Sequence, residues 1–547
     1  MSDKEITTAI TGRAISAGLA AGRTFVHWDR LRELDAPISI DTEHVEEEFE
    51  QLEDATKTIS EDLLALATRV EMEMNSKLAA IFESHEMMLN DQSLKEELRS
   101  EIRGKLVSAS SAVKAVFLRW EKRFQLMESK MANHKGDDMH DISNRLTNAL
   151  AGIKINPLEE MPADSVLVAR RLLPSDTIFL SHQSCIAVLL EYGGASSHAA
   201  LFTREMGLPC IAGIPELLNK VPTGAWALID AHLGEALINP QAQQKAAFKR
   251  KVVASRKNSV SALKRAQEQA VTRVGVPISV LANVGRREDT EQAVANGADG
   301  VGLYRSEQIY IGRTTPPDVD QLYDQMRSTL EPAKGKPVCV RLLDVGADKS
   351  LPFIHFRSEA NPTLGRRGIR LLHEYPALLE TQLRAILKLC GEFDVSILVP
   401  MVVLPEDMAV VKECLTQLGA ELGVLPLPQL GAMIETPAAA LSAATLQPYA
   451  DFMSFGTNDL TQYTFAADRE NEAVEKYFDD SAAVIFRLIA IVHNDVPRMP
   501  LFVCGELAGY TEHIPTLLQC GIKALSVAAP LIPIVKEAIR ESSFIEI

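Results

Sequence analysis

The sequence predicts an α/β protein with a helical insertion in its N-terminal half and a (β/α)8 barrel in its C-terminal half. The 547 residues are enough for two to four domains. Helical periodicity from Asp41 to about residue 150 interrupts short β-like segments, and after residue 275 eight apolar, β-branched-rich segments alternate with helical patterns. A doubly wound sheet is the alternative, but eight regular units favour closure into a barrel.

The composition excludes several classes of protein. A formal charge of −17 argues against a general nucleic-acid or anionic-membrane binder. The seven cysteines are odd in number, widely spread and without a CxxC pair, which is typical of reduced cytosolic thiols and of neither a disulfide framework nor a zinc site. The first ten residues lack an apolar signal region, and no apolar segment reaches the ~18–20 residues of a membrane helix. We therefore expect a soluble, cytoplasmic protein without membrane insertion.

The N-terminal half contains one α/β domain in two pieces. Residues 6–27 carry short β-like runs around glycines, and strands return at 163–240, with Gly224 and Gly234 at turns. Between them, apolar residues recur at three- and four-residue steps, and this helical pattern is expected to break near residues 90 and 135. The helical pattern begins with Val45, Phe49, Leu52, Ile59, Leu63, Leu66 and Val70.

Four segments follow from this order. Residues 1–40 and 151–240 form the α/β domain, and residues 41–150 are its helical insertion. Residues 241–270 are charged and lack Gly and Pro, which favours a solvated linker helix over a nucleic-acid patch in so acidic a chain. Residues 271–547 form the barrel, whose expected strands lie at 277–284, 297–307, 337–346, 395–402, 429–436, 452–460, 500–507 and 523–529.

Polar residues gather at the ends of these strands. In a barrel the C-terminal ends of the strands form one mouth, where active sites lie. The candidates are Arg305 ending the second strand, Arg341 on the third, Glu435 ending the fifth, Asn458 and Asp459 ending the sixth, Arg469 in the loop after the sixth, and Cys504, Gly505 and Glu506 ending the seventh. Arginines offer paired donors to phosphate and carboxylate groups, and two carboxylates suit a Mg²⁺ that completes its shell with substrate oxygens. Cys504 is either a buried structural thiol or a proton donor. Phosphoenolpyruvate is a small substrate that fits these groups.

One histidine stands apart from the barrel. His198 lies in GGASSHAALFTREMGLPCIAG (193–213), where a helical pattern begins. It is either a satisfied residue at a helix cap or an anion site, because a helix N-terminus offers free N–H groups and partial positive charge.

These segments resemble the phosphoenolpyruvate-utilising enzymes. The segment around His198 is similar to their phosphohistidine segment, and GTNDLTQYTFAADR (456–469), AMIETPAAA (432–440) and CGELAG (504–509) resemble their barrel motifs. IFESHEMMLNDQSLKEE (81–97) resembles the HPr-docking helical subdomain of the Enzyme I family of the bacterial phosphotransferase system. The similarity runs from about residue 9 to the end.

The resemblance implies a role for each matching position. His198 is the histidine phosphorylated by phosphoenolpyruvate, and Cys504 is the acid that protonates the enolate. The other implied roles are a hydrogen bond to that histidine from Thr177, substrate clamping by Arg305, Arg341 and Arg469, a substrate contact from Asn458 and Asp459, and Mg²⁺ ligation by Glu435 and Asp459. The implied partners are phosphoenolpyruvate and an HPr-type phosphocarrier protein, and the implied assembly is a homodimer through the barrel domain. Ala195 replaces a common arginine and Arg366 a usual tryptophan, which leaves the local contacts open.

Three rival functions differ from this one. A pyruvate–phosphate dikinase or phosphoenolpyruvate synthase needs an ATP-grasp domain, for which no room remains. Pyruvate kinase gives no reason for His198 or the helical insertion. A non-catalytic regulatory scaffold would tolerate the loss of site residues, yet each position carries a competent residue type. Whether an acceptor would serve sugar uptake or a regulatory relay is left open by the sequence.

Overall fold

The computed structural model describes most of residues 7–543. It leaves out residues 28–36, 74–75, 127–129, 153–156, 175, 177–179, 181–184, 194–199, 201, 204–205, 312, 347–350, 355–358, 469–470, 472–473, 475–476 and 480. Thr177, Ala195, His198 and Arg469 therefore lie outside the described residues. The chain divides into two compact units, residues 1–252 and 253–547, and each is described by itself.

An eight-stranded sheet organises the described part of the first unit, in the order β1-β8-β7-β3-β4-β5-β6-β2. Apolar side chains on its two faces form two separate cores, one around Val166 and Ile229 and the other around Leu167 and Val188. The strands are β1 Thr8–Thr11, β2 Arg13–Ser16, β3 Leu19–His27, β4 Ser165–Ala169, β5 Cys185–Leu190, β6 Cys210–Ala212, β7 Trp226–Asp230 and β8 Glu235–Ile238, with the short helix α8 Leu217–Lys220 between β6 and β7. Gly224 and Gly234 have φ of +81° and +67°, as expected for turn glycines.

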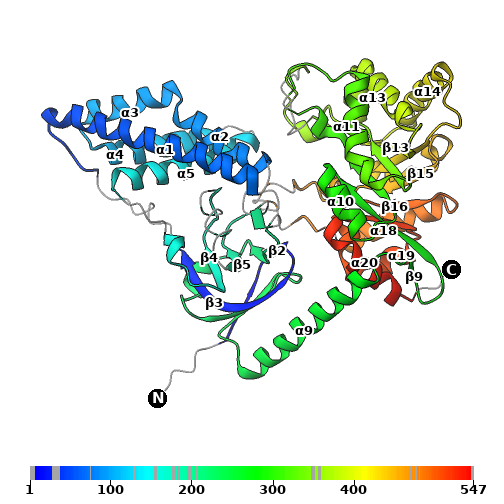
Figure 1. Cartoon of the computed structure of the whole chain (residues 1–547), viewed down its shortest axis with the longest axis horizontal. Coiled ribbons are helices and arrows are strands. Elements are labelled where there is room, and N and C mark those ends of the chain that lie inside the picture. The colour runs from blue at the N-terminus through cyan, green and yellow to red at the C-terminus, as the bar shows by residue number, and fades with distance from the viewer. Residues whose placement is uncertain are drawn as a thin grey trace. The chain divides into compact units, whose positions relative to one another are not determined.

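The helical segment is an insertion between two neighbouring strands. Strand β3 pairs in parallel with β4, with Arg23 opposite Ser165, although the whole helical segment separates them in sequence. Figure 1 shows its helices packed side by side: α1 Val45–Glu73, α2 Ser76–Leu89, α3 Gln92–Lys105, α4 Ala109–Leu126 and α5 Lys130–Leu150. Residue 90 does lie at a break. The break expected near residue 135 was wrong, because α5 runs through that position while its buried Met139, Ile142 and Leu146 keep one apolar stripe.

Helix α9 (Ala242–Lys264) occupies the segment expected to be a linker helix, and the division between the units falls within it. In the middle of the helix, the Lys251 ammonium pairs with Asp230 of β7. Beyond its end, the fully buried Lys536 donates to the Ala266 carbonyl at 3.0 Å and to Asp299 at 2.8 Å. The helix is therefore tied to the first unit through Lys251, and the segment that follows it is tied to the second unit through Ala266.

The second unit is a closed barrel of eight parallel strands among the described residues. Strand β10 pairs in parallel with both β11 and β17, which closes the ring, and the short β9 Ala270–Val271 adds to β10 antiparallel. All eight expected strands are present, so the barrel prediction is confirmed over the doubly wound alternative. They are β10 Pro277–Val284, β11 Val301–Arg305, β12 Pro337–Arg341, β13 Asp394–Val399, β14 Gln429–Ile434, β15 Phe452–Phe455, β16 Leu501–Val503 and β17 Ala524–Ala528.

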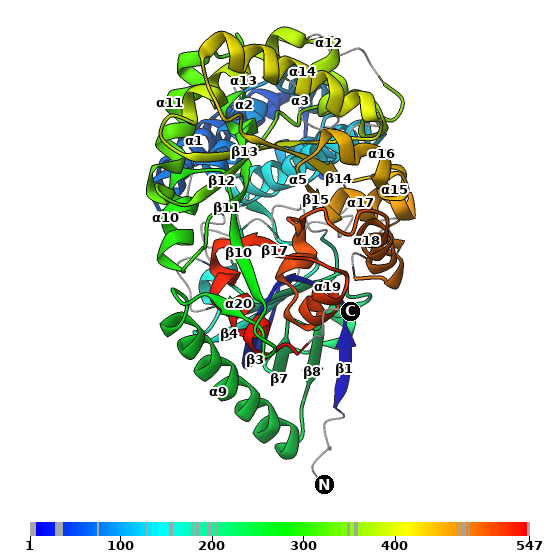
Figure 2. The same ribbon diagram turned by 90° about the vertical axis from the view of Figure 1, so that its right-hand side faces the viewer.

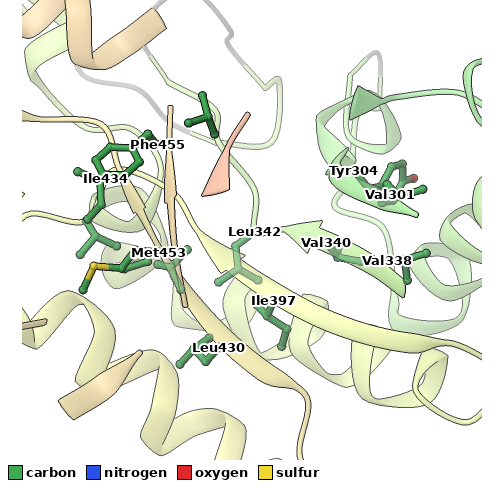
Figure 3. Close-up of a cluster of buried hydrophobic side chains, with 14 of the residues drawn as sticks. Val301, Tyr304, Val338, Val340, Leu342, Ile397, Leu430, Ile434, Met453 and Phe455 are labelled. Atoms are coloured by element: carbon green, nitrogen blue, oxygen red, sulfur yellow. The ribbon is translucent and has the colours of Figure 1, made fainter. Parts of the chain in front are cut away.

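Helices surround this ring of strands in chain order (Figure 2). They are α10 Arg287–Ala295, α11 Val319–Leu330, α12 Ile369–Glu374, α13 Pro376–Leu389, α14 Pro405–Leu422, α15 Pro437–Leu441, α16 Ala443–Leu446, α17 Thr457–Phe465, α18 Ala483–Asp495, α19 Ile514–Gln519 and α20 Ile532–Glu541. Alternate strand residues face them, so that Val338 and Val340 belong to the large core shown in part in Figure 3, while Cys339 belongs to a smaller core with Cys504. Within the described part of the chain, no helix combines the length and apolar character that crossing a membrane requires.

Candidate active site at the barrel mouth

Four of the candidate residues lie where the barrel strands end. Arg305 is the last residue of β11 and is exposed, and Arg341 is the buried last residue of β12. Glu435 directly follows β14, and Cys504 directly follows β16. Because all eight strands are parallel, these side chains share the C-terminal mouth of the barrel.

Asn458 and Asp459 occupy a different element from the one expected. Strand β15 already ends at Phe455 and α17 begins at Thr457, so both residues lie in the first turn of that helix. The change of direction occurs at Gly456, where a Cβ atom would lie 2.7 Å from the Glu435 Oε1 atom. The Asn458 side-chain oxygen accepts a hydrogen bond from the Glu506 N–H at 2.9 Å, which ties α17 to the turn after β16.

A chain of alternating charges crosses the mouth. The Arg341 Nη2 donates to Glu307 at 2.8 Å, and its Nη1 lies 3.3 Å from the Asp344 carboxylate. The Arg367 guanidinium lies 3.0 Å from Asp344 and 2.9 Å from Asp459. All five side chains are buried. We call this row, Glu307–Arg341–Asp344–Arg367–Asp459, the buried charge chain.

Glu435 adds a fourth carboxylate to these groups. It is buried, and its Oε2 accepts from the Met401 N–H at 2.8 Å. Burial, together with the charges of Asp459 and Asp344, raises the pKa of Glu435 to about 8, although Arg367 and Arg341 oppose the rise. Four buried carboxylates thus face two buried guanidinium groups, and full ionisation would leave two negative charges in excess.

This donor set fits a hard divalent cation. The metal-binding pair expected from the sequence, Glu435 and Asp459, supplies carboxylate oxygens on neighbouring strand–helix units and carries the excess charge. Among the described residues, no cluster of three or more His, Cys, Asp or Glu side chains is arranged around one metal position. Mg²⁺ commonly uses only one or two protein carboxylates and keeps water or substrate oxygens, so a pair suffices for it.

Cys504 is buried inside the mouth. The Ser454 hydroxyl donates to its sulfur at 3.2 Å, and the thiol points toward the Phe455 carbonyl at 3.6 Å. Burial raises the pKa of Cys504 to about 11, while the Ser454 hydrogen bond and the charges of Arg341 and Arg305 pull it down. The thiol therefore stays protonated at neutral pH and can act as an acid there.

Sequence reasoning missed three members of the buried charge chain as site residues. Glu307, Asp344 and Arg367 contact one another or Arg341, yet none of them ends a strand. Arg367 did carry a signal, because it stands in GRRGIR, where two glycines flank an arginine pair in the long loop after the third strand. Its neighbour Arg366, singled out in the sequence, points instead to Glu359 and Glu374 at 3.3 and 3.2 Å and forms ion pairs there.

The expected phosphohistidine segment is described only at its edges. His198 follows β5 and precedes β6 in sequence, and it lies outside the described residues, as does Thr177. Asp176, next to Thr177, is buried and accepts from the Leu173 N–H at 3.0 Å. Burial raises its pKa to about 6, against the pull of His27.

Comparison with known proteins covers almost the whole chain. Three family descriptions match: "PEP-utilising enzyme, N-terminal" at residues 11–134, "PEP-utilising enzyme, mobile domain" at 161–234 and "PEP-utilising enzyme, PEP-binding domain" at 260–544. The last of these spans the barrel and its buried charge chain, and it alone covers more than half of the chain.

Curated relatives carry one name. The phosphoenolpyruvate-protein phosphotransferase of Haloferax volcanii is 35% identical over 502 residues, covering 90% of this chain and 87% of the relative. Those of Geobacillus stearothermophilus and Haemophilus influenzae are 33% and 31% identical, covering 95% and 98% of this chain and 91% and 94% of theirs. With all three family segments in order and relatives of this identity along their whole length, the chain belongs to the PEP-utilising enzyme family, among the phosphoenolpyruvate-protein phosphotransferases.

Proposed function

We propose that the chain transfers the phosphoryl group of phosphoenolpyruvate to His198, releases pyruvate, and passes the phosphoryl group to a histidine of an HPr-type carrier protein. This is the first step of a phosphotransferase system for sugar uptake or its regulation. The observation that carries the proposal is the barrel mouth, where arginines, paired carboxylates and a protonated thiol converge at strand ends. The names and the extent of the matching relatives support the same reaction.

The arginines of the mouth bind the substrate anion in this proposal. Arg305 and Arg341 end neighbouring strands, paired at Arg305–Arg341 in the barrel register, so their guanidinium groups can share one phosphate or carboxylate. Asn458, and Arg469 in the loop that follows α17, add further donors. Phosphoryl transfer needs mainly positioning and charge neutralisation, which these groups supply.

Glu435 and Asp459 hold Mg²⁺ in this proposal. When bound, the cation neutralises developing charge on the substrate oxygens and orients the phosphoryl group. The surplus of carboxylates over guanidinium groups in this cluster and the raised pKa of Glu435 support a cation at these carboxylates. The Arg367 guanidinium does not replace it, because that group is already engaged with Asp344 and Asp459.

The reaction leaves an enolate that must gain a proton. As the enol-phosphate P–O bond breaks, a P–N bond forms with the neutral imidazole of His198, and the electron pair remains on the enolate oxygen. The Cys504 thiol then gives its proton to the methylene carbon, and solvent restores it. A raised thiol pKa keeps that proton available at neutral pH.

His198 must then reach two partners. We assign the barrel to the phosphoenolpyruvate site, the helical insertion (residues 41–150) to HPr docking, and the α/β domain (residues 1–40 and 151–240) to the phosphohistidine. The linker (residues 241–270) allows the exchange between them. A homodimer through the barrel domain (residues 271–547) and a cytoplasmic location complete the proposal.

Labelled phosphoenolpyruvate tests this function directly. The whole chain, Mg²⁺ and candidate HPr proteins are incubated, and the label is located by acid lability and mass spectrometry. We expect stoichiometric label on His198 and onward transfer to HPr, and His198→Ala should abolish both without unfolding the protein. Acid-labile phosphate on the His198→Ala variant would overturn the assignment, and labelling that is independent of Mg²⁺ would remove the metal from it.

A further inference from the structure

Arg367 makes the most extensive set of polar contacts in the described mouth. Its Nη1 donates to Asp459 Oδ1 at 2.9 Å and its Nη2 lies 3.4 Å from Asp459 Oδ2, so the guanidinium meets both oxygens of that carboxylate. On its other edge, Nη2 and Nε donate to Asp344 at 3.0 and 3.3 Å. One planar group thus holds two carboxylates by two contacts each.

The arrangement is rigid on the arginine side. The Tyr463 hydroxyl lies 3.2 Å from Arg367 Nη1 and donates to the Thr363 carbonyl at 2.5 Å, which fixes it as an acceptor for Arg367. Burial opposes the charge of Arg367, but Asp344, Asp459 and Glu435 outweigh it and raise its pKa. The guanidinium therefore stays charged and stays in place. Gly368, the next residue, has φ of +55°, and a Cβ atom there would lie only 3.0 Å from Met401 Cβ, so both the backbone conformation and the available space favour glycine.

Asp459 needs such support because of where it stands. It lies in the first turn of α17, and its side chain would otherwise be free to turn to the N–H groups that a helix start leaves unbonded. A carboxylate has about four lone-pair positions, and the two contacts to Arg367 leave two for other partners. The two contacts from Arg367 thus select one orientation of Asp459 without using all of the lone-pair positions of its carboxylate.

We propose that Arg367 is a positioning residue for the metal-binding carboxylate Asp459. Its guanidinium holds Asp459 in the orientation that binds a divalent cation, and through Asp344 it also fixes the position of Arg341. This inference rests on the proposed function for the metal-binding role of Glu435 and Asp459 and for the identity of the substrate. In it, Arg367 acts through Asp459 and Asp344 rather than by a contact of its own to substrate or metal.

Arg367→Lys removes the paired donors of the guanidinium while keeping the positive charge. A lysine ammonium is a point donor and cannot hold two carboxylates by two contacts each. Manganese binding to the whole chain, without phosphoenolpyruvate, is measured from the electron paramagnetic resonance signal of free Mn²⁺. We expect the dissociation constant for Mn²⁺ to rise ~10–100-fold, as is usual when a residue that orients a metal ligand is lost. With phosphoenolpyruvate and Mg²⁺, kcat should fall at saturating substrate more than KM rises.

Arg366→Lys is the matched control. It changes the adjacent arginine of the same loop, whose guanidinium pairs with Glu359 and Glu374, and it should leave Mn²⁺ affinity and kcat within about twofold. If Arg367→Lys does not fold, Tyr463→Phe removes the hydroxyl beside Arg367 without changing any charge, and a smaller weakening of Mn²⁺ binding, about two- to fivefold, is expected.

Each outcome decides the proposal. Weaker Mn²⁺ binding in Arg367→Lys but not in Arg366→Lys supports it. Unchanged or tighter Mn²⁺ binding overturns it, and so does a loss of turnover with unchanged Mn²⁺ affinity, which would make Arg367 a substrate contact. Failure of the proposed function is distinguishable, because the wild-type chain would then bind Mn²⁺ yet take no label from phosphoenolpyruvate.

Discussion

The backbone at Gly505 lies close to the start of α17 in the described barrel mouth, and Gly505→Ala should damage catalysis more than folding. Gly505 stands between Cys504 and Glu506, facing the start of α17. A Cβ atom there would lie 1.9 Å from Thr457 Oγ1, 2.7 Å from the Thr457 backbone nitrogen and 2.9 Å from Asn458 Oδ1. The threonine hydroxyl could rotate away, but the backbone nitrogen cannot.

The required movement sets the magnitude. An ordinary contact begins near 3.4 Å, so α17 and the turn after β16 must separate by about 0.7 Å at the Thr457 nitrogen. That separation moves Cys504 relative to Asn458 and Asp459, and misplacements of about 1 Å cost on the order of 100-fold in rate. We expect a 10- to 100-fold lower rate of pyruvate release from phosphoenolpyruvate. The overpacking should cost about 1–3 kcal/mol in the free energy of unfolding.

Rapid-quench measurement of pyruvate release, alongside urea unfolding, checks both numbers. Gly391→Ala is the control, because Gly391 lies in the same barrel and its Cβ would meet its nearest atom only at 3.4 Å. The reasoning is refuted if Gly505→Ala releases pyruvate within threefold of wild type, or if Gly391→Ala loses as much activity.

Three further predictions concern separate features. Cys504→Ser should retain phosphoryl transfer to His198 better than it retains protonation of the enolate carbon, because a hydroxyl is a weaker acid than the thiol. Label transfer measures the first step and pyruvate formation the second, and equal losses in both would make Cys504 a packing residue. Lys536→Met should lower the free energy of unfolding, measured in urea, by about 2–3 kcal/mol, because it removes the ammonium that binds Asp299 and the Ala266 carbonyl. A change under about 0.5 kcal/mol would show that these contacts do not stabilise the segment after α9. Hydrogen bonds from Tyr323 and Arg327 lower the pKa of Glu392 to about 2. The ionised carboxylate therefore stabilises the fold above its ordinary pKa of 4.5, and this stabilisation is lost as the pH falls toward 2. Glu392→Gln should have a lower melting temperature than wild type at pH 7 and the same melting temperature near pH 2.

The barrel could be predicted because each of its strands appears in the sequence as an apolar segment of the length typical of a β-strand. VSILVPMV is almost wholly buried, as parallel strands are, whereas PISVLANV alternates between buried and more exposed residues, and the spacing of the segments left room for one helix between each pair. The helical insertion could also be predicted, because the spacing of apolar residues changed from every second residue to every third or fourth residue at its start. The break near residue 135 was misread because the sequence of Lys130–Leu150 is rich in polar residues, and such a composition also occurs in loops.

The candidate site residues that could be predicted lie at or shortly after the ends of strands. Arg341, Glu435 and Cys504 could be found by counting from strand ends, because parallel strands place those positions on one rim. Arg367 could not, since it reaches the mouth from the loop that follows β12, and a loop's path is set by tertiary contacts such as Glu359 to Arg366. Asp344 is a similar case, because its role comes from lying between two arginines that are 26 positions apart in sequence.

The charges of the mouth explain why an acidic chain can handle an acidic substrate. The chain carries a formal charge of −17, and the buried charge chain together with Glu435 places four carboxylates against two guanidinium groups where the proposed substrate would bind. An anion entering that mouth alone would meet like charge at low dielectric, where repulsion is strongest. In the proposed function, a divalent cation on Glu435 and Asp459 would offset this charge and leave the exposed Arg305 to attract the anion. The carboxylates would then make substrate binding conditional on the metal, and Arg367 would make metal binding conditional on the fold.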